Sequence, residues 1–169
     1  MPQPGDISLT IRALTPQDAE TCDAIIRTLP YHFGDPGGRE ECAPAVRRDP
    51  GLVAVVGGEV IGFLTVVRHF PASAEITWMA VRSDQRRRGI GGRLIAHLCA
   101  ALRAGGCHLL LVMTLSALYE EAERRDGYAQ TRAFYRANGF FAARDLPDYW
   151  PNSPALLMVR PLDASNHGA

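Results

Sequence analysis

The chain has 169 residues, of which 47% are hydrophobic and 21% charged, a composition typical of one globular domain. Eighteen arginines, with no lysine, balance 18 acidic residues, so no overall field exists that would recruit nucleic acid or an anionic membrane. No apolar run reaches the ~20 residues of a membrane span and the first residues lack signal-peptide regions, so we expect a cytoplasmic protein.

The first third of the chain carries a strand pattern followed by two helix patterns. Residues 7–12 alternate between apolar and polar side chains, as a half-buried strand does. Thr15 and Asp18 fit the positions of a helix N-cap and a capping-box acid, and the apolar residues that follow recur at helical spacing. A short helix is expected over residues 39–48, and Pro44 predicts that this helix is irregular or broken.

The rest of the chain continues to alternate between strand and helix patterns, with glycine and proline at the turns. The expected elements are strands at 52–56, 60–68 and 75–82, a helix from 90 to 104, a strand at 107–114, a helix at 130–138, and strands at 140–144 and 155–160. Residues 163–169 are expected to form a loose tail. No linker divides the chain, so we expect a single domain over residues 1–169.

One junction is rich in both arginine and glycine. Residues 86–92 read Arg-Arg-Arg-Gly-Ile-Gly-Gly, between a strand pattern and an amphipathic helix. Glycines let the backbone approach an anion, a helix start directs free N–H groups at it, and arginines add charge. A Walker loop would need Lys and Ser or Thr where Arg93 and Leu94 stand, and a dinucleotide fingerprint would need glycine at 94. The pattern that fits is RxxGxG, beginning at Arg86.

This pattern, with the strand at 74–81 and the segment 132–140, resembles the GNAT superfamily of N-acetyltransferases over roughly residues 7–161. The resemblance implies an α/β (α+β) fold, a single domain whose mixed central sheet of about six to seven strands is flanked by helices on both faces. It also implies acetyl-CoA as the cofactor, with its pyrophosphate on the glycine-rich loop. The implied cofactor-binding residues are Met79, Ala80, Val81, Arg86, Arg87, Arg88, Gly89, Ile90, Gly91, Gly92, Arg93 and Tyr135.

Acetyl transfer to an amine calls for a base. An alkylammonium group with a pKa near 10.4 is deprotonated about once in 10³ at pH 7, a handicap of roughly 4–5 kcal/mol. By the resemblance over residues 74–81, Glu75 is the candidate base. The two-residue period of a strand puts Thr77 and Met79 on the same face as Glu75, and Ile76 and Trp78 on the other. The alternative is an exposed carboxylate at a strand end.

The leaving thiolate, with an ordinary pKa of about 8.5, benefits from a proton donor near the sulfur. By the resemblance over residues 132–140, Tyr135 is the general acid. The alternative is a packing residue with its hydroxyl at the surface. The resemblance also implies that the backbone N–H of Met79 or Val81 polarises the carbonyl, where two strands splay apart.

In GNAT enzymes the early variable region and the segment corresponding to 116–128 usually flank the acceptor cleft. Both segments carry carboxylates here, which favour a cationic amine, and aromatic side chains that could wall the cleft. An ordinary solvated helix explains the same charges without any ligand. The candidate substrate-binding residues are Tyr31, Asp35, Glu75, Thr77 and Tyr128.

We therefore expect an N-acetyltransferase that moves the acetyl group of acetyl-CoA directly to a primary amine of a small cationic molecule, such as an amino sugar, aminoglycoside or polyamine-like compound. The alternatives are a protein or peptide N-acetyltransferase and, in a different class, a non-catalytic CoA-binding sensor. Arginine in place of lysine suggests a GC-rich bacterial genome, and family precedent suggests a homodimer. No nucleic-acid or membrane partner is expected.

The cysteines and histidines show no spacing typical of a metal site or a disulfide framework. The four cysteines lack CxxC pairs, and we interpret them as buried free thiols. No metal is expected, and the histidines are interpreted as surface or packed residues. This interpretation covers four of the five histidines, which are His32, His69, His97 and His108.

Overall fold

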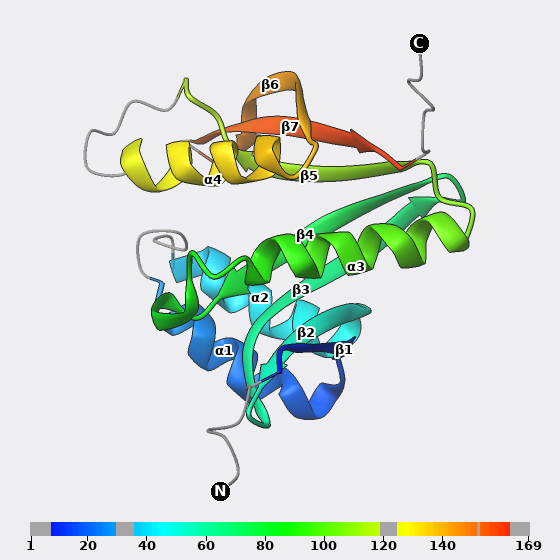
Figure 1. Ribbon diagram of the computed structural model, residues 1–169. Helices are drawn as coiled ribbons and strands as arrows, with labels where there is room; N and C mark the ends of the chain where they lie inside the picture. The colour runs from blue at the N-terminus through cyan, green and yellow to red at the C-terminus, as the bar shows by residue number, and fades with distance from the viewer. Residues whose placement is uncertain (1–7, 30–35, 119–124, 152, 163–169) are drawn as a thin grey trace, which may run out of the picture. The chain divides into compact units, whose positions relative to one another are not determined.

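The computed structural model describes residues 8–29, 36–118, 125–151 and 153–162 (Figure 1). Its strands are β1 (Thr10–Ala13), β2 (Gly51–Val56), β3 (Glu59–Phe70), β4 (Ser73–Val81), β5 (Leu109–Leu115), β6 (Phe141–Trp150) and β7 (Ser153–Pro161). Its α-helices are α1 (Ala19–Arg27), α2 (Pro36–Arg48), α3 (Ile90–Ala104) and α4 (Arg125–Ala137), and two 3₁₀ turns are η1 (Pro16–Asp18) and η2 (Ser83–Gln85).

Within the described residues, the strands form one seven-stranded sheet in the order β1-β2-β3-β4-β5-β7-β6. The sheet is mixed, because β4 and β5 run parallel while β1–β2, β2–β3, β5–β7 and β6–β7 are antiparallel. The expected mixed sheet of six to seven strands and the α+β class are therefore confirmed. None of the helices in this part of the chain is both long and apolar enough to cross a membrane.

By its internal contacts the chain divides into two compact units. The first comprises Met1–Thr65 and Trp78–His97, and the second comprises Val66–Thr77 and Leu98–Ala169. The first unit therefore contains the arginine- and glycine-rich loop, and the second contains Glu75 and Tyr135. Because β3, β4 and α3 each contribute residues to both units, the division does not follow the boundaries of the helices and strands.

In the first unit, α1 and α2 lie side by side and share one hydrophobic core with the strands (Figure 1). The expected start of α1 is confirmed: the Asp18 carboxylate accepts hydrogen bonds from the backbone N–H and the hydroxyl of Thr15, both at 2.9 Å. The core contains Cys22, Ile25 and Ile26 of α1, Cys42 and Val46 of α2, and Val53, Val60 and Phe63 of the sheet.

The prediction that Pro44 breaks the second helix is wrong. The helix runs from Pro36 to Arg48 with Pro44 inside it. Pro44 is exposed, whereas Ala45 and Val46, the residues after it, are 4% and 2% exposed. Burial of that apolar side stabilises the helix by more than one lost backbone hydrogen bond costs, so tertiary packing overrides the local preference.

In the second unit, α4 is followed along the chain by β6 and β7, which pair with each other (Figure 1). The strand expected at 140–144 extends to Trp150 in β6, although its sequence continues as Asp-Leu-Pro-Asp. β6 is an edge strand, so the missing N–H of Pro147 interrupts no further ladder, and the pairing with β7 shifts register between Leu146 and Trp150. The helix expected from 130 begins earlier, at Arg125.

All four cysteines are buried and free, which confirms their interpretation. Cys22 and Cys42 belong to the core between α1 and α2, and burial raises the pKa of each thiol to about 12. The Cys107 thiol donates to the Ala72 carbonyl at 3.3 Å. The Cys22 and Cys42 thiols are structural, because their reactive thiolate form is suppressed.

Candidate active site

The loop between β4 and α3 adopts a backbone that ordinary residues avoid. Arg87 has φ of 62° and Gly89 has φ of 75°, so two left-handed residues occur within three positions. A left-handed conformation costs a non-glycine residue about 1–2 kcal/mol, and such strain tends to collect at ligand-binding sites. A Cβ atom added to Gly89 would meet no atom within 4 Å, so open space adjoins the backbone there.

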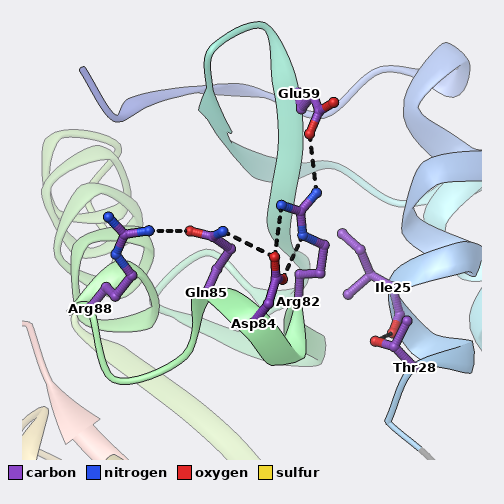
Figure 2. A network of polar contacts seen from close by, with 7 residues as sticks. All are labelled: Ile25, Thr28, Glu59, Arg82, Asp84, Gln85 and Arg88. Carbon is purple, nitrogen blue, oxygen red and sulfur yellow. Dashed lines mark hydrogen bonds and ion pairs between the residues drawn. The ribbon is translucent and has the colours of Figure 1, made fainter. Parts of the chain in front are cut away.

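A chain of polar contacts holds this loop, as Figure 2 shows. The Arg82 guanidinium donates to both carboxylate oxygens of Asp84, at 2.7 and 3.1 Å, and to Glu59 at 3.2 Å. The Gln85 amide donates to Asp84 at 3.2 Å, and its oxygen accepts from Arg88 at 2.6 Å. The chain therefore runs from the start of β3 to Arg88.

Arg82 differs from the arginines that follow it in the sequence. Arg82 is engaged by two carboxylates, and its guanidinium lowers the pKa of Asp84. Its positive charge is therefore compensated within the protein. The ion pairs in the described part of the chain include none to Arg86, Arg87, Arg88 or Arg93, so their charge is available to an anion.

The first turn of α3 adds backbone donors to this charge. The Arg93 N–H donates to the Gly89 carbonyl at 3.1 Å, which begins the helical hydrogen bonds. The N–H groups before it have no acceptor inside the helix, and the positive end of the helix dipole lies with them. Ile90 is 5% exposed and anchors the turn. The arginines, the open glycine and the helix start together fit a polyphosphate ligand.

Burial matches the predicted two faces of β4 as far as Ile76, and Trp78 is half-buried against the hydrophobic core. Ala74 and Ile76 are 0% and 2% exposed, whereas Glu75, Thr77 and Met79 are only half-buried. β4 pairs with β5 from Ser73 opposite Leu109 to Ile76 opposite Val112. Both strands continue past this ladder, β4 to Val81 and β5 to Leu115. Met79, Ala80 and Val81 therefore lie on the part of β4 outside the ladder.

Glu75 has a partner that the sequence interpretation did not identify. Its Oε2 lies 2.6 Å from Nε2 of His69, across the turn between β3 and β4. The Glu75 side chain is 16% exposed and that of His69 is 42% exposed. His69 was interpreted as a surface or packed histidine; it is at the surface, but it contacts the candidate base.

Tyr135 lies within α4 and is 7% exposed. Its ring contacts Phe134 and Phe140 edge to face, each with ring centroids 5.3 Å apart. Burial raises the pKa of Tyr135 above its ordinary value, so the phenol is protonated at neutral pH. The ring is therefore a packed part of the core, and its phenol keeps its proton at neutral pH.

Only some of the residues predicted to bind the acceptor amine lie in the part of the chain that the structure describes. Thr77 on β4 and Tyr128 on α4 are half-buried. Tyr31 and Asp35 lie outside the described residues, as do residues 119–124 of the acidic segment. Near that segment, the Ser116 hydroxyl donates to Asp145 and accepts from the Leu118 N–H, so Asp145 is engaged within the fold.

Comparisons with known proteins identify the family. The sequence profile of the acetyltransferase (GNAT) domain matches residues 48–141. These 94 residues span the arginine- and glycine-rich loop, β4 and all of α4, and make up more than half of the 169-residue chain. The chain belongs to the GNAT acetyltransferase family. It is an acyltransferase that uses acetyl-CoA. No curated protein matches its sequence.

Solved structures share the fold at low identity. One is the ribosomal-protein-S18-alanine N-acetyltransferase from Escherichia coli, with a TM-score of 0.72, 20% identity, and coverage of 96% of this chain and 99% of that one. Ard1 from Thermoplasma volcanium gives 0.71 and 23%, covering 92% and 98%. An aminoglycoside 6'-N-acetyltransferase complexed with coenzyme A gives 0.70 and 19%, covering 91% and 97%. Likeness at this identity shows the fold, and the named acceptors differ.

Sequence reasoning missed His69 and Gln85. Gln85 precedes the RxxGxG pattern by one residue and tethers Arg88 in that pattern. His69 precedes Glu75 by six residues, with Pro71 between them. A hairpin turn at Pro71 would have signalled that the two side chains can meet across neighbouring strands.

Proposed function

We propose that this protein transfers the acetyl group of acetyl-CoA directly to a primary amine of a small cationic molecule, with Glu75 as general base and Tyr135 as general acid. One observation carries the proposal. Glu75 is a shielded carboxylate on β4, the strand that runs into the arginine- and glycine-rich loop. Acetyl-CoA, when bound, supplies an acetyl thioester whose carbonyl carbon accepts the amine.

The cofactor-binding residues follow from the loop geometry. Arg86, Arg87, Arg88 and Arg93 would neutralise the phosphates, and the backbone from Gly89 to Gly92 would donate hydrogen bonds to them. The open space at Gly89 supports a close approach of the ligand. The section of β4 from Met79 to Val81, outside the β4–β5 ladder, is the segment assigned to the rest of the cofactor.

Glu75 would remove the proton that keeps an amine unreactive. At pH 7 about one amine in 10³ is neutral, so a carboxylate that accepts this proton offsets roughly 4 kcal/mol. Partial exposure supports this role, because an acceptor amine can reach a carboxylate that is not fully buried. Tyr135, protonated and buried, would supply a proton to the departing sulfur.

The acceptor class rests on charge in the segments expected to flank the cleft. Residues 116–128 contain four carboxylates, and Asp35 lies in the early variable region. Acidic side chains there would attract a cation and would disfavour an acidic acceptor. The acceptors named for the solved relatives include both an aminoglycoside and a ribosomal protein, so the choice between small molecule and protein rests on the test below.

The test is thiol release from acetyl-CoA over a panel of aminoglycosides, polyamines, amino acids and basic peptides, for wild type, Glu75→Gln and Tyr135→Phe. We expect release with a small cationic amine, reduced in both variants, while all three proteins gain thermal stability from acetyl-CoA. Release with peptides alone would overturn the acceptor class. Tight binding without release, for any amine, would favour the sensor. Full activity of Glu75→Gln would overturn the assignment of the base.

A further inference from the structure

We propose that His69 is a positioning residue that relays to solvent the proton which Glu75 removes from the acceptor amine. The proposal rests on the role proposed for Glu75 and adds a second residue to it. Its basis is the contact between Nε2 of His69 and Oε2 of Glu75 at 2.6 Å, within the second unit of the molecule. Two nitrogens in one ring let an imidazole accept a proton on one side and release it on the other.

The hairpin geometry explains why these two residues meet. His69 is the second-last residue of β3 and Glu75 is the third residue of β4, with Pro71 and Ala72 between the strands. The turn is fastened to the segment that follows α3: Arg68 Nη1 donates to the carbonyls of Pro71 and Gly105, at 3.1 and 3.3 Å. The pair is therefore held by the fold.

Ala72, in the same turn, strengthens this attachment. Its carbonyl accepts from the backbone N–H of His108 at 2.8 Å and of Leu109 at 3.0 Å. Both bonds lead to the start of β5, the parallel neighbour of β4. A turn tied to two segments keeps the distance between His69 and Glu75 short without any ligand, as a preorganised relay requires.

The difference in exposure gives the pair a direction. Glu75 is 16% exposed and His69 is 42% exposed, so water reaches the imidazole more readily than the carboxylate. In the relay, the amine proton moves to a Glu75 oxygen, and a proton moves from Glu75 to Nε2 of His69. The N–H bond at Nδ1 then breaks to water, which leaves a Glu75 carboxylate that accepts a hydrogen bond from the Nε2–H of a neutral imidazole. Exchange of the ring protons with water returns the proton to Nδ1 before the next amine proton is accepted. Atoms and charges balance at each step.

Few other titratable groups face this pair among the described residues. β4 carries no second titratable side chain, and β5 carries none at all. On β3, Arg68 is next to His69, but two carbonyls engage its guanidinium. His108, which precedes β5, is exposed. The charged or titratable neighbours of His69 and Glu75 on these elements are therefore Arg68 and His108.

The first experiment compares His69→Ala, His69→Gln and Glu75→Gln with wild type, using the panel amine that releases thiol fastest. We expect kcat to fall about 10-fold in both His69 variants, because neither side chain can pass a proton on. Free imidazole added to the buffer should restore part of the rate in His69→Ala and none in Glu75→Gln. His97→Ala, which removes an exposed histidine on α3, is the matched control and should keep the wild-type rate.

The kinetic outcomes separate this proposal from the one it rests on. Unchanged activity in Glu75→Gln would overturn the assignment of the base, and the relay with it. Loss in Glu75→Gln with a wild-type rate in both His69 variants would overturn the relay alone. Full activity in His69→Gln would reduce His69 to a hydrogen-bonding partner. An equal loss from His69→Ala in the Glu75→Gln background would show that His69 does not act through Glu75.

A second readout needs no acceptor. Nitrogen-15 spectra of the histidine rings report which ring nitrogen carries a proton, and the Nε2 resonance of His69 should move in Glu75→Gln. The resonances of His97 should stay in place. An unchanged His69 spectrum would show that the contact is absent in solution, and the relay would be overturned.

Discussion

The arginine- and glycine-rich loop and the β3–β4 hairpin differ in whether their charged side chains are paired. In the loop, four exposed arginines lack carboxylate partners among the described residues, and only Arg82 is neutralised. In the hairpin, one shielded carboxylate is matched with one imidazole. Uncompensated charge suits a site that must attract a polyanion, whereas a paired carboxylate suits a site through which a single proton passes.

The first way to test this contrast is to remove the base. Glu75→Gln keeps the size of the side chain but cannot accept a proton, so kcat should fall by about 10² to 10⁴. The dissociation constant for acetyl-CoA should stay within about twofold of wild type, because Glu75 belongs to the hairpin and not to the loop. Steady-state kinetics and calorimetric titration measure the two quantities. A large loss of acetyl-CoA affinity in Glu75→Gln would contradict the separation between a hairpin that acts in proton transfer and a loop that binds the cofactor.

Tyr135→Phe should have the next largest effect. The phenyl ring preserves the edge-to-face contacts with Phe134 and Phe140, so the melting temperature should change little. Loss of the phenolic proton should lower kcat by about 10- to 100-fold. If the enzyme instead unfolds at a much lower temperature with unchanged kcat, Tyr135 is a packing residue only.

Variants of Arg88 and Gln85 test whether the arginine- and glycine-rich loop binds acetyl-CoA. Arg88→Ala should weaken acetyl-CoA binding about 10-fold and reduce its salt dependence, since one phosphate contact is lost. Gln85→Ala removes the tether at 2.6 Å and should weaken binding about threefold, with kcat unchanged. Gln17→Ala, an exposed glutamine in η1, is the control. In the Arg88→Ala background, Gln85→Ala should add nothing; an equal loss there would mean that Gln85 acts independently.

The Asp18 carboxylate has a structural role only. It forms a bidentate pair with Arg12 at 2.8 Å, and this pairing lowers the pKa of Asp18 to about 2. Because the folded value lies below the ordinary one, the stabilisation is complete above about pH 4 and is lost as the pH falls toward 2. Asp18→Asn should cost about 1–2 kcal/mol at pH 7 in urea denaturation and much less near pH 2. An equal cost at both pH values would contradict this account.

Local patterns anticipated the loop better than the hairpin. Residues 86–92 predict a strand-to-helix turn that suits an anion, and the two faces of β4 around Ile76 follow from alternation. The contact between His69 and Glu75 requires β3 to continue to Phe70 and β4 to begin at Ser73, beyond the predicted strand ends at 68 and 75. The continuity of α2 through Pro44 and the length of β6 also depend on tertiary contacts, since packing or an edge position decides whether a proline is tolerated.

The burial of the cysteines has a practical consequence for enzymology. A disulfide reagent that counts each released CoA reacts with thiolates, and at pH 8 Cys22 and Cys42, with pKa values of about 12, offer almost none. The folded enzyme therefore adds little background signal to an assay that follows thiol release. When the core between α1 and α2 unfolds, these two thiols become reactive. A slow, late increase in the signal of the disulfide reagent therefore reports the rate at which the enzyme unfolds.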